Sequence, residues 1–265
     1  MTNIAIIGAA GRMGCALVRG SRCSEGLTVV AALEQSGHAA IGRDAGAVAG
    51  IGEIGIAITD NLKAIEKADV AVDFSFHSAV PANMKTAARL GKAVVLGTTG
   101  LSDDEAAAVK AAAAKIPVLW APNMSLGVNV LFAMVEKAAG VLGLDYDAEI
   151  VEVHHRHKKD APSGTALRLG ERIAAGRGQN FKDVACFGRE GLAGARPQGE
   201  IGIHAVRSGD VVGEHTVSFA TEGERLEFTH RASSRDAFAA GALKAARWLA
   251  GRAPGLYDMK DVLGL

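Results

Sequence analysis

The sequence of 265 residues predicts an α/β protein, with a doubly wound parallel sheet followed by a second α+β domain that contains a mixed sheet. Three observations predict this class. Apolar runs of strand length alternate with helical patterns in the first half, a glycine-rich turn joins the first run to the first helix, and the pattern changes after Asn123. Beyond that point, strand-like runs follow one another with short turns between them.

The first half contains five apolar runs of strand length. They are NIAIIG (3–8), LTVVAALE (27–34), DVAVDFS (69–75), KAVVLGTTG (92–100) and IPVLWAPN (116–123). Strands that helices cover on both faces are continuous apolar runs of this kind. We therefore expect these five segments to form a buried parallel sheet.

Helical patterns lie between these runs, at 12–20, more weakly at 61–67, at 78–90 and at 103–115. The clearest is SDDEAAAVKAAAAK, in which Ser102 can cap the helix, acidic residues fill the first turn and alanine dominates the body. Because strand and helix alternate in this way, the sheet is expected to be doubly wound.

The second half begins with a helical pattern at 126–142, a strand near 147–155 and a helix from about 165 to 176. Residues 177–199 are rich in glycine and basic residues and predict a long loop. The runs EIGIHAVR, VVGEHTVSFA and RLEFTHRA follow, and the turns SGD and TEG between them predict a meander.

The last helical pattern, at 236–251, carries apolar residues at helical spacing and is expected to pack back on the first domain. The predicted division is therefore a first domain of residues 1–125 with 236–265, and a second domain of residues 126–235. The two would be joined by hinges near 124–129 and 232–236.

Charge and hydropathy exclude several classes of protein. Lys and Arg total 29, as do Asp and Glu, so a nucleic-acid or other polyanion binder is not expected. No apolar stretch approaches the roughly 18 residues of a membrane span, and the first residues lack the basic leader of a signal peptide. Cys15, Cys23 and Cys186 match no metal knuckle or disulfide framework, which favours the reducing cytoplasm.

A glycine pattern joins the first strand to the first helix. In IAIIGAAGRMG, Gly8, Gly11 and Gly14 form GxxGxxG, a variant of the dinucleotide-binding pattern. Gly8 lets the strand turn, Gly11 lets the backbone approach a pyrophosphate and Gly14 lets the helix pack closely. Glu34 follows about 20 residues later, where an acid is expected to bind the adenosine ribose. Together these residues favour a Rossmann-like dinucleotide-binding domain over an ordinary glycine-rich turn.

The cofactor is expected to be NADH or NADPH. Gln35 stands where an arginine would help to neutralise a 2′-phosphate, although Arg12 or Arg43 could supply that charge. GTTG (97–100) and APNMS (121–125) end the fourth and fifth predicted strands, at the edge of the sheet where ligands bind. Their backbone and polar groups could hold the nicotinamide half, although plain loop chemistry is an alternative.

The stretch VEVHHRHKKDAPSGT (151–165) places three histidines, one arginine and two lysines in six positions. His155 and His157 have strand-like spacing and could share a metal, but no third ligand is nearby and the adjacent cations oppose metal binding. No aromatic residues interleave to stack on nucleic-acid bases. A solvated basic loop and a site for an anionic substrate remain.

An anionic-substrate site explains more of this stretch. Pro162 fixes the start of a helix, Ser163 can cap it, and Gly164 and Thr165 offer N–H groups for a carboxylate. Lys158 adds a positive charge beside this helix N-terminus.

Strand parity places His154 and Lys158 on one face, about 13 Å apart if the chain stays extended. We expect the chain to bend after the strand instead, because the segment 160–162 has the composition of a turn. The cationic surroundings should lower the pKa of a histidine here, and a bound dianion would reverse this, which suits proton exchange near neutral pH.

The segments GAAGRMG, GTTG, APNMSLGVN, EVHHRHKKDAPSGTAL, GDVVGEHTVSFA and HRASSRDAFAAGAL together resemble the 4-hydroxy-tetrahydrodipicolinate (dihydrodipicolinate) reductase family, in order and over nearly the whole chain. The resemblance implies NAD(P)H-dependent reduction of 4-hydroxy-tetrahydrodipicolinate to tetrahydrodipicolinate in the diaminopimelate pathway of lysine biosynthesis. It also implies a homotetramer built through the sheet of the second domain. A cyclic dicarboxylate substrate would account for the basic stretch.

The resemblance implies roles for the matching residues. His154 and Lys158 would be catalytic, and no metal would take part. The substrate would be bound by His155, Lys158, Ser163, Gly164 and Thr165. The cofactor would be bound by Gly8, Ala9, Ala10, Gly11, Arg12, Met13, Glu34, Gly97, Thr98, Thr99, Ala121, Pro122, Asn123 and Met124. Two residues depart from the family's usual pattern, Gln35 in place of arginine and Met124 in place of phenylalanine.

A non-catalytic, NAD(H)-sensing regulatory protein is the alternative from another class. Such a sensor would bind the dinucleotide and an anion without turnover, and it has no need of a titratable acid beside a hydride acceptor. His154 and Lys158 therefore favour the enzyme.

Overall fold

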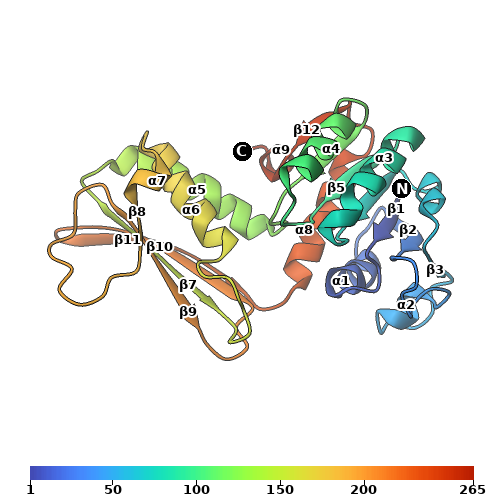
Figure 1. Ribbon diagram of the computed structural model, residues 1–265, viewed down its shortest axis with the longest axis horizontal. Coiled ribbons are helices and arrows are strands. Elements are labelled where there is room, and N and C mark those ends of the chain that lie inside the picture. The colour runs from blue at the N-terminus through green and yellow to red at the C-terminus, as the bar shows by residue number, and fades with distance from the viewer. The chain divides into compact units, whose positions relative to one another are not determined.

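The computed structural model describes residues 1–265, and the chain divides into two compact units, whose elements Figure 1 labels. Unit 1 comprises Met1–Leu126 and Arg235–Gly264, and unit 2 comprises Gly127–Ser234 together with Leu265. None of the helices combines the length and the apolar character that crossing a membrane requires.

Unit 1 contains a seven-stranded parallel sheet in the order β12-β6-β5-β4-β1-β2-β3. The strands are β1 (Thr2–Ile7), β2 (Leu27–Leu33), β3 (Ile58–Thr59), β4 (Val70–Asp73), β5 (Ala93–Leu96), β6 (Pro117–Trp120) and β12 (Gly255–Tyr257). The chain winds from β1 to one edge and then from β4 to the other, so the predicted doubly wound sheet is confirmed. The switch point between β1 and β4 is where such sheets bind ligands.

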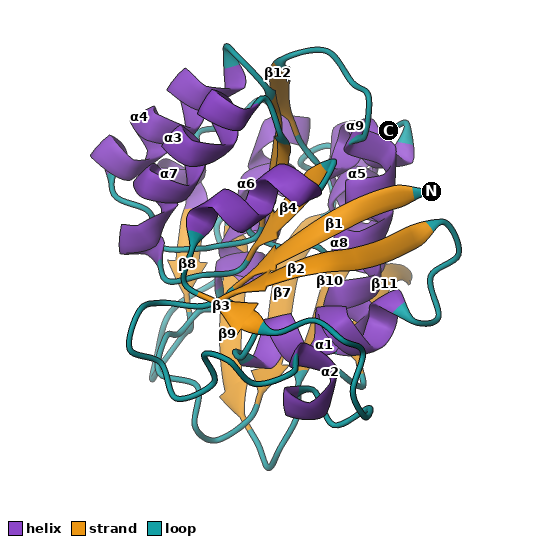
Figure 2. Ribbon diagram, turned by 90° about the vertical axis from the view of Figure 1, so that its right-hand side faces the viewer, coloured by secondary structure: helices purple, strands orange, loops and turns teal.

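Helices cover both faces of this sheet, as Figure 2 shows for the fan of strands and the helices around it. The α-helices are α1 (Arg12–Ser21), α2 (Ala45–Val48), α3 (Val80–Leu90), α4 (Asp103–Ala113), α8 (Asp236–Leu249) and α9 (Met259–Leu263), with the 3₁₀-helices η1 (Leu62–Lys67) and η2 (His77–Ala79). α1 and α8 share one apolar core with Ile4 and Ile6, while α3 and α4 share the other with Ala5 and Ile7. Because both faces are buried, the strands are continuous apolar runs.

The termini of these elements follow local chemistry. Ser102 and Glu105 form a capping box at the start of α4, where the sequence predicts a cap. β4, β5 and β6 are shorter than the predicted strands, because the polar ends of those runs form the loops at the ligand-binding edge of the sheet. α2, β3, β12 and α9 were not predicted, since elements of two to five residues carry no measurable periodicity.

Unit 2 contains a five-stranded mixed sheet in the order β11-β10-β7-β9-β8. Its strands are β7 (Asp147–His154), β8 (Ala185–Phe187), β9 (Ile201–Arg207), β10 (Gly213–Thr221) and β11 (Glu224–Ala232), and its helices are α5 (Leu126–Leu142), α6 (Gly164–Gly176) and α7 (Phe181–Val184). α5 and α6 cover one face, where Val135 and Leu169 pack with Ile150, Val217 and Phe219 (Figure 1). The predicted mixed sheet is confirmed.

The predicted meander is wrong in its first half. β7 lies between β9 and β10, parallel to the first and antiparallel to the second, so SGD connects strands that do not pair. Only β10 and β11 form a hairpin, across the TEG turn. Alternating residues specify which face of a strand is buried but not which strand lies beside it.

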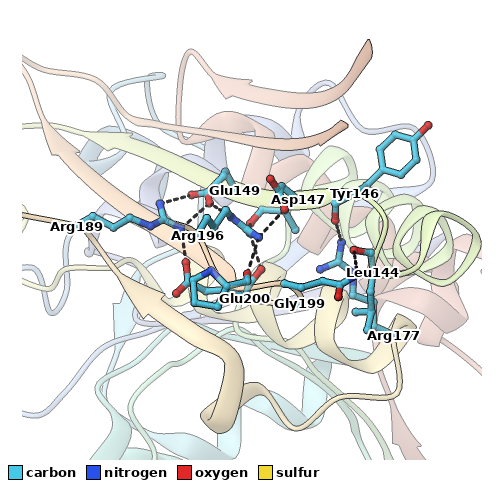
Figure 3. Close-up of polar contacts among 12 residues, drawn as sticks. Leu144, Tyr146, Asp147, Glu149, Arg177, Arg189, Arg196, Gly199 and Glu200 are labelled. Carbon is cyan, nitrogen blue, oxygen red and sulfur yellow. Dashed lines mark hydrogen bonds and ion pairs between the residues drawn. The ribbon is translucent and has the colours of Figure 1, made fainter. Parts of the chain in front are cut away.

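The predicted loop at 177–199 is also partly wrong, because α7 and β8 lie within it. The rest of the segment is tied to the sheet by an ionic cluster around Glu149 (Figure 3). Glu149 Oε1 accepts from Arg189 Nη2 at 2.8 Å and from Arg196 Nε at 2.9 Å, and Oε2 lies 2.8 Å from His204 Nε2. Burial alone would raise the pKa of Glu149, but these donors lower it to about 2.

Replacing Glu149 with Gln should lower the free energy of unfolding at neutral pH by about 1–3 kcal/mol, because two arginines lose a charged acceptor. The folded-state pKa lies below the ordinary 4.5, so the carboxylate stabilises the fold above that pH, and this stabilisation is lost as the pH falls towards 2. Denaturant unfolding across this range checks the prediction. The variant should lose stability less steeply in acid than the parent chain, and equal slopes would contradict the proposed cause.

Candidate active site

The glycine turn after β1 forms a tight cradle at the N-terminus of α1. Gly8 has a φ of +79°, and a Cβ on Gly14 would lie 2.1 Å from the carbonyl oxygen of Gly8, so the helix begins in direct contact with the turn. Gly11 is the N-cap, and no side chain caps the helix there. The first N–H groups of α1 therefore remain available to an anion such as a pyrophosphate.

Glu34 follows β2 directly and borders this cradle. Its Oε2 accepts from the backbone N–H of Ala10 at 3.1 Å, and its Oε1 accepts from that of Gln35 at 3.0 Å. A cavity of about 470 Å³ lies here at the carboxyl edge of the sheet. Its lining includes Gly8, Gly11, Glu34, Gln35, Ser36, His38, Asp60, Phe74, Ser75 and Phe76.

A second cavity of about 450 Å³ continues along the same edge. Its lining includes Met13, Gly97, Thr98, Thr99, Pro122, Asn123, Met124, Phe238 and residues 74–77. Phe74, Ser75 and Phe76 line both cavities, so the two adjoin at the loop after β4. One cavity lies beside Glu34, the other beside loops that carry hydroxyl groups, and two adjoining spaces of this kind could take the two halves of a dinucleotide.

Not every residue predicted to bind the cofactor lines a cavity. Ala9 and Ala121 are buried in the core, and Ala10 and Arg12 belong to neither lining. Phe74 was missed by the sequence analysis, although DVAVDFS places it at the carboxyl end of a strand, where ligands bind. A Cβ on Gly97 would lie 2.2 Å from the ring of Phe74, so that glycine makes room for the aromatic side chain.

Unit 2 holds the predicted catalytic histidine at the end of β7. The inward residues of this strand change from apolar, Ala148 and Ile150, to polar, Glu152 and His154, and all four are buried. His154 Nδ1 lies 2.5 Å from Oε2 of Glu152. Because an ionised carboxylate only accepts, the Nδ1 position carries the proton, and Nε2 is left for other chemistry.

Glu152 joins several elements. Its two oxygens accept from Arg207 of β9 at 2.8 and 2.9 Å, and Oε1 also accepts from the backbone N–H of Ser163 at 2.9 Å. Ser163 caps α6 by accepting from Ala166 N at 3.1 Å, and its Oγ lies 3.0 Å from Nε2 of His215. One buried carboxylate thus connects β7, β9 and the start of α6.

Electrostatics keeps both histidines neutral near pH 7. Burial lowers the pKa of His154, and Lys158 and Arg207 add to this against the raising effect of Glu152. Burial, and then the neighbouring His154, lower the pKa of His215 to about 3. A neutral imidazole at His154, with its Nδ1 proton donated to Glu152, presents an Nε2 that can take up and return a proton.

The chain bends after His154, as predicted. The backbone N–H of Lys158 donates to the carbonyl of His155 at 3.1 Å, and Lys158 Nζ donates to Asp160 Oδ1 at 2.9 Å. Gly164 and Thr165 form the first turn of α6 behind the Ser163 cap. The half-buried His155 has a buried Nδ1 without a hydrogen-bond partner.

The structure contains no group of three or more His, Cys, Asp or Glu side chains placed to hold a metal ion. Glu152, Arg207 and His215 are the residues of this cluster that the sequence analysis missed. Glu152 had a signal, since it precedes His154 by two residues and so shares its face of the strand. Arg207 and His215 had none, because their place depends on how β9 and β10 pair with β7.

Comparisons with known proteins agree with this arrangement. Residues 2–124 match the family described as dihydrodipicolinate reductase, N-terminus, and residues 127–263 match dihydrodipicolinate reductase, C-terminus. The 4-hydroxy-tetrahydrodipicolinate reductase of Anaeromyxobacter dehalogenans (strain 2CP-C) is 53% identical over 100% of this chain and 98% of its own length. That of Geobacter sulfurreducens is 50% identical over 100% of both.

A solved structure is similar as well. The dipicolinate-bound dihydrodipicolinate reductase from Paenisporosarcina sp. TG-14 has a TM-score of 0.75 and 25% sequence identity, and 97% of each chain is covered. Nothing in these comparisons supports the alternative of a non-catalytic sensor. The protein is an oxidoreductase that uses a nicotinamide cofactor. Matched along both halves and over its full length, the chain belongs to the dihydrodipicolinate reductase family.

Proposed function

We propose that unit 2 binds 4-hydroxy-tetrahydrodipicolinate through the N-terminus of α6 and Lys158, and that His154 exchanges a proton with it at Nε2. The reaction of this family reduces that compound to tetrahydrodipicolinate in the diaminopimelate pathway of lysine biosynthesis. The observation that carries the assignment is His154, whose Nδ1 is engaged by Glu152 while the same carboxylate holds the cap of α6.

Carboxylate binding follows from the local charges. The N–H groups of Gly164 and Thr165 lie in the first turn of α6, where the helix dipole stabilises a negative charge. Lys158 adds an ammonium group whose partner, Asp160, is exposed and can be replaced by a substrate carboxylate. His155 supplies a further polar contact. The dipicolinate in the structure of the Paenisporosarcina relative has the same pair of carboxylates as this proposed substrate.

The proton chemistry belongs to His154 and Lys158. A bound dianion raises the pKa of His154 and favours a protonated Nε2, which can then donate. When bound, the reduced nicotinamide supplies the hydride. Lys158 and the N-terminus of α6 stabilise the negative charge that develops on the substrate, which we expect to be the larger catalytic effect.

Unit 1 would hold the cofactor along its two adjoining cavities, and we propose that NADH is preferred to NADPH. The cavity around the ribose-binding acid is lined by Glu34 and Asp60, and its lining contains neither lysine nor arginine. A 2′-phosphate there would meet two carboxylates and neither a lysine nor an arginine. Gln35 lines the same cavity and is the position where a cation would act on that phosphate.

We also propose that the chain forms a homotetramer through the outer face of the mixed sheet. α5 and α6 cover only the inner face. The outer face carries Val151 and Val206, which are 39% and 42% exposed, the paired hydroxyls of Thr216 and Thr229, and charged side chains that are already paired, such as Glu214 with Arg231. A face of this composition suits burial against a second copy.

Replacing His154 with Gln should lower kcat by about 10²–10⁴-fold, because general acid–base catalysis contributes this much. The Kd for NADH should stay unchanged, since His154 lies in the other unit from the dinucleotide cavities. Replacing Lys158 with Ala should lower kcat and raise the substrate KM together. NADH oxidation followed by absorbance and NADH binding by fluorescence measure both variants. An H154Q variant that loses NADH binding as much as turnover would contradict the assignment.

Replacing Gln35 with Arg should lower the KM for NADPH by about tenfold, because a charge-assisted hydrogen bond to the 2′-phosphate is worth about 1.5–3 kcal/mol. The KM for NADH should change little. Steady-state kinetics with both cofactors test this, with Gln35→Ala as the control that removes the side chain without adding charge. The parent chain should have the lower KM for NADH, and equal values for both cofactors would overturn the proposed preference.

Replacing Val151 with Glu should dissociate the tetramer, because a charge would be buried without a partner in the interface. Light scattering after size-exclusion chromatography gives the mass. Val141→Glu is the matched control, since Val141 is 79% exposed on α5 and away from the outer face of the sheet. A parent chain of monomeric mass would rule out the proposed assembly.

A further inference from the structure

We infer that Glu152 is a positioning residue, which together with Arg207 fixes His154 in the form whose Nε2 faces the substrate and locks that imidazole to the carboxylate-binding end of α6. This inference rests on the proposed function, in which His154 is the acid–base group. It assigns a role in turnover to two residues that need not touch the substrate.

The hydrogen bonds of Glu152 hold its carboxylate in one orientation. Its carboxylate accepts from His154 Nδ1, from Ser163 N and twice from Arg207, and the side chain is completely buried. Four donors match the accepting capacity of a carboxylate. A carboxylate only accepts, so the ring nitrogen that faces it carries the proton, and with Nδ1 in that place the neutral imidazole is the Nδ1–H tautomer.

Arg207 contributes to the charge balance around His154. Burial lowers the pKa of His154, the carboxylate of Glu152 opposes this, and the positive charges of Lys158 and Arg207 lower the pKa further. Arg207 also donates to the carbonyl of Asp160, in the loop that carries Lys158. The same guanidinium therefore adjusts the proton affinity of His154 and anchors the segment that presents the second cationic group.

The hydrogen bond from Ser163 N to Glu152 links the carboxylate that orients His154 to the start of α6. Ser163 is the cap of α6, whose next residues, Gly164 and Thr165, would bind a substrate carboxylate. The position of the acid–base imidazole is thereby coupled to the position of the anion site. Such coupling matters because displacements of about 1 Å in a reacting geometry can cost about 10²-fold in rate.

The surroundings reserve space for Nε2. Gly213 begins β10, next to Glu214, which pairs with Val153 of β7, and a Cβ on Gly213 would lie 3.0 Å from His154 Nε2. On β10 the neutral ring of His215 meets His154 edge-on, with centroids 5.1 Å apart. The charged or titratable groups that act on His154 are Glu152, Lys158, Arg207 and His215, and the loop adds the Asp160 partner of Lys158.

The competing explanation is that Glu152 only stabilises the fold. A second glutamate on β7, Glu149, provides a control for this explanation. Glu149 lies three residues before Glu152, on the opposite face of β7, and also binds two groups of this kind, arginine and histidine. Glu149→Gln therefore removes an equivalent carboxylate from the same strand without contact to His154. Any effect on the pH profile that E152Q shows and E149Q does not is separate from the loss of an ionic cluster on β7.

The test compares the full-length E152Q, R207Q and E149Q variants with the parent chain, with NADH as cofactor. E152Q should lower kcat by at least about tenfold, and by no more than the 10²–10⁴-fold that the acid–base group itself supplies. The pKa of His154 in the pH profile should move down in E152Q, which loses the carboxylate, and up in R207Q, which loses the guanidinium. E149Q should lose stability and keep the profile of the parent.

The tautomer is read directly from the ¹⁵N chemical shifts of His154 in the parent chain, so the inference remains testable even if E152Q fails to fold. Protonation at Nδ1 in the neutral form is expected, and protonation at Nε2 would overturn the inference. Pre-steady-state activity and pH profiles of E152Q and R207Q that match those of E149Q would overturn it as well. If H154Q itself retains full turnover, the proposed function fails instead.

Discussion

The structure of unit 2 depends on the compensation of one buried negative charge. Glu152 has no contact with water, and a carboxylate removed from water is tolerated only when donors surround it. The donors come from β7, from β9 and from the N-terminus of α6, so satisfying this single group requires three elements to meet at one point. The donors that compensate the buried charge also fix the position of Glu152, and Glu152 in turn fixes His154 through its hydrogen bond to Nδ1.

In unit 1 the candidate binding site is built around the turn between β1 and α1 and contains no buried ion pair of the kind that Glu152 and Arg207 form. The cradle at α1 offers the backbone N–H groups of the first helical turn, and Glu34 at the end of β2 accepts from the backbone N–H groups of Ala10 and Gln35 beside it. Small residues are needed where the backbone must approach closely, as Gly8 and Gly14 show. The polar groups of this site are therefore mostly backbone groups, whereas those around His154 in unit 2 are charged side chains.

The sequence predicted what depends on local patterns. The bounds of α5, the caps at Ser102 and Ser163 and the cradle at Gly8 follow from periodicity, hydrogen-bonding side chains and backbone sterics, which act over a few residues. It did not predict that β7 separates β9 from β10, because strand patterns do not encode neighbours. Arg207 was missed for the same reason, since only the β7–β9 pairing brings it to Glu152.

Unit 1 is assembled from both ends of the chain, with unit 2 inserted between them. The family halves divide at residues 124 and 127, yet α8 and β12, which belong to the later half, complete the core and the edge of the first sheet. A ribosome therefore releases most of the polypeptide before the dinucleotide fold can close around its apolar centre. Until then the face of the sheet that α8 covers stays partly open, while the residues of the inserted unit are already complete.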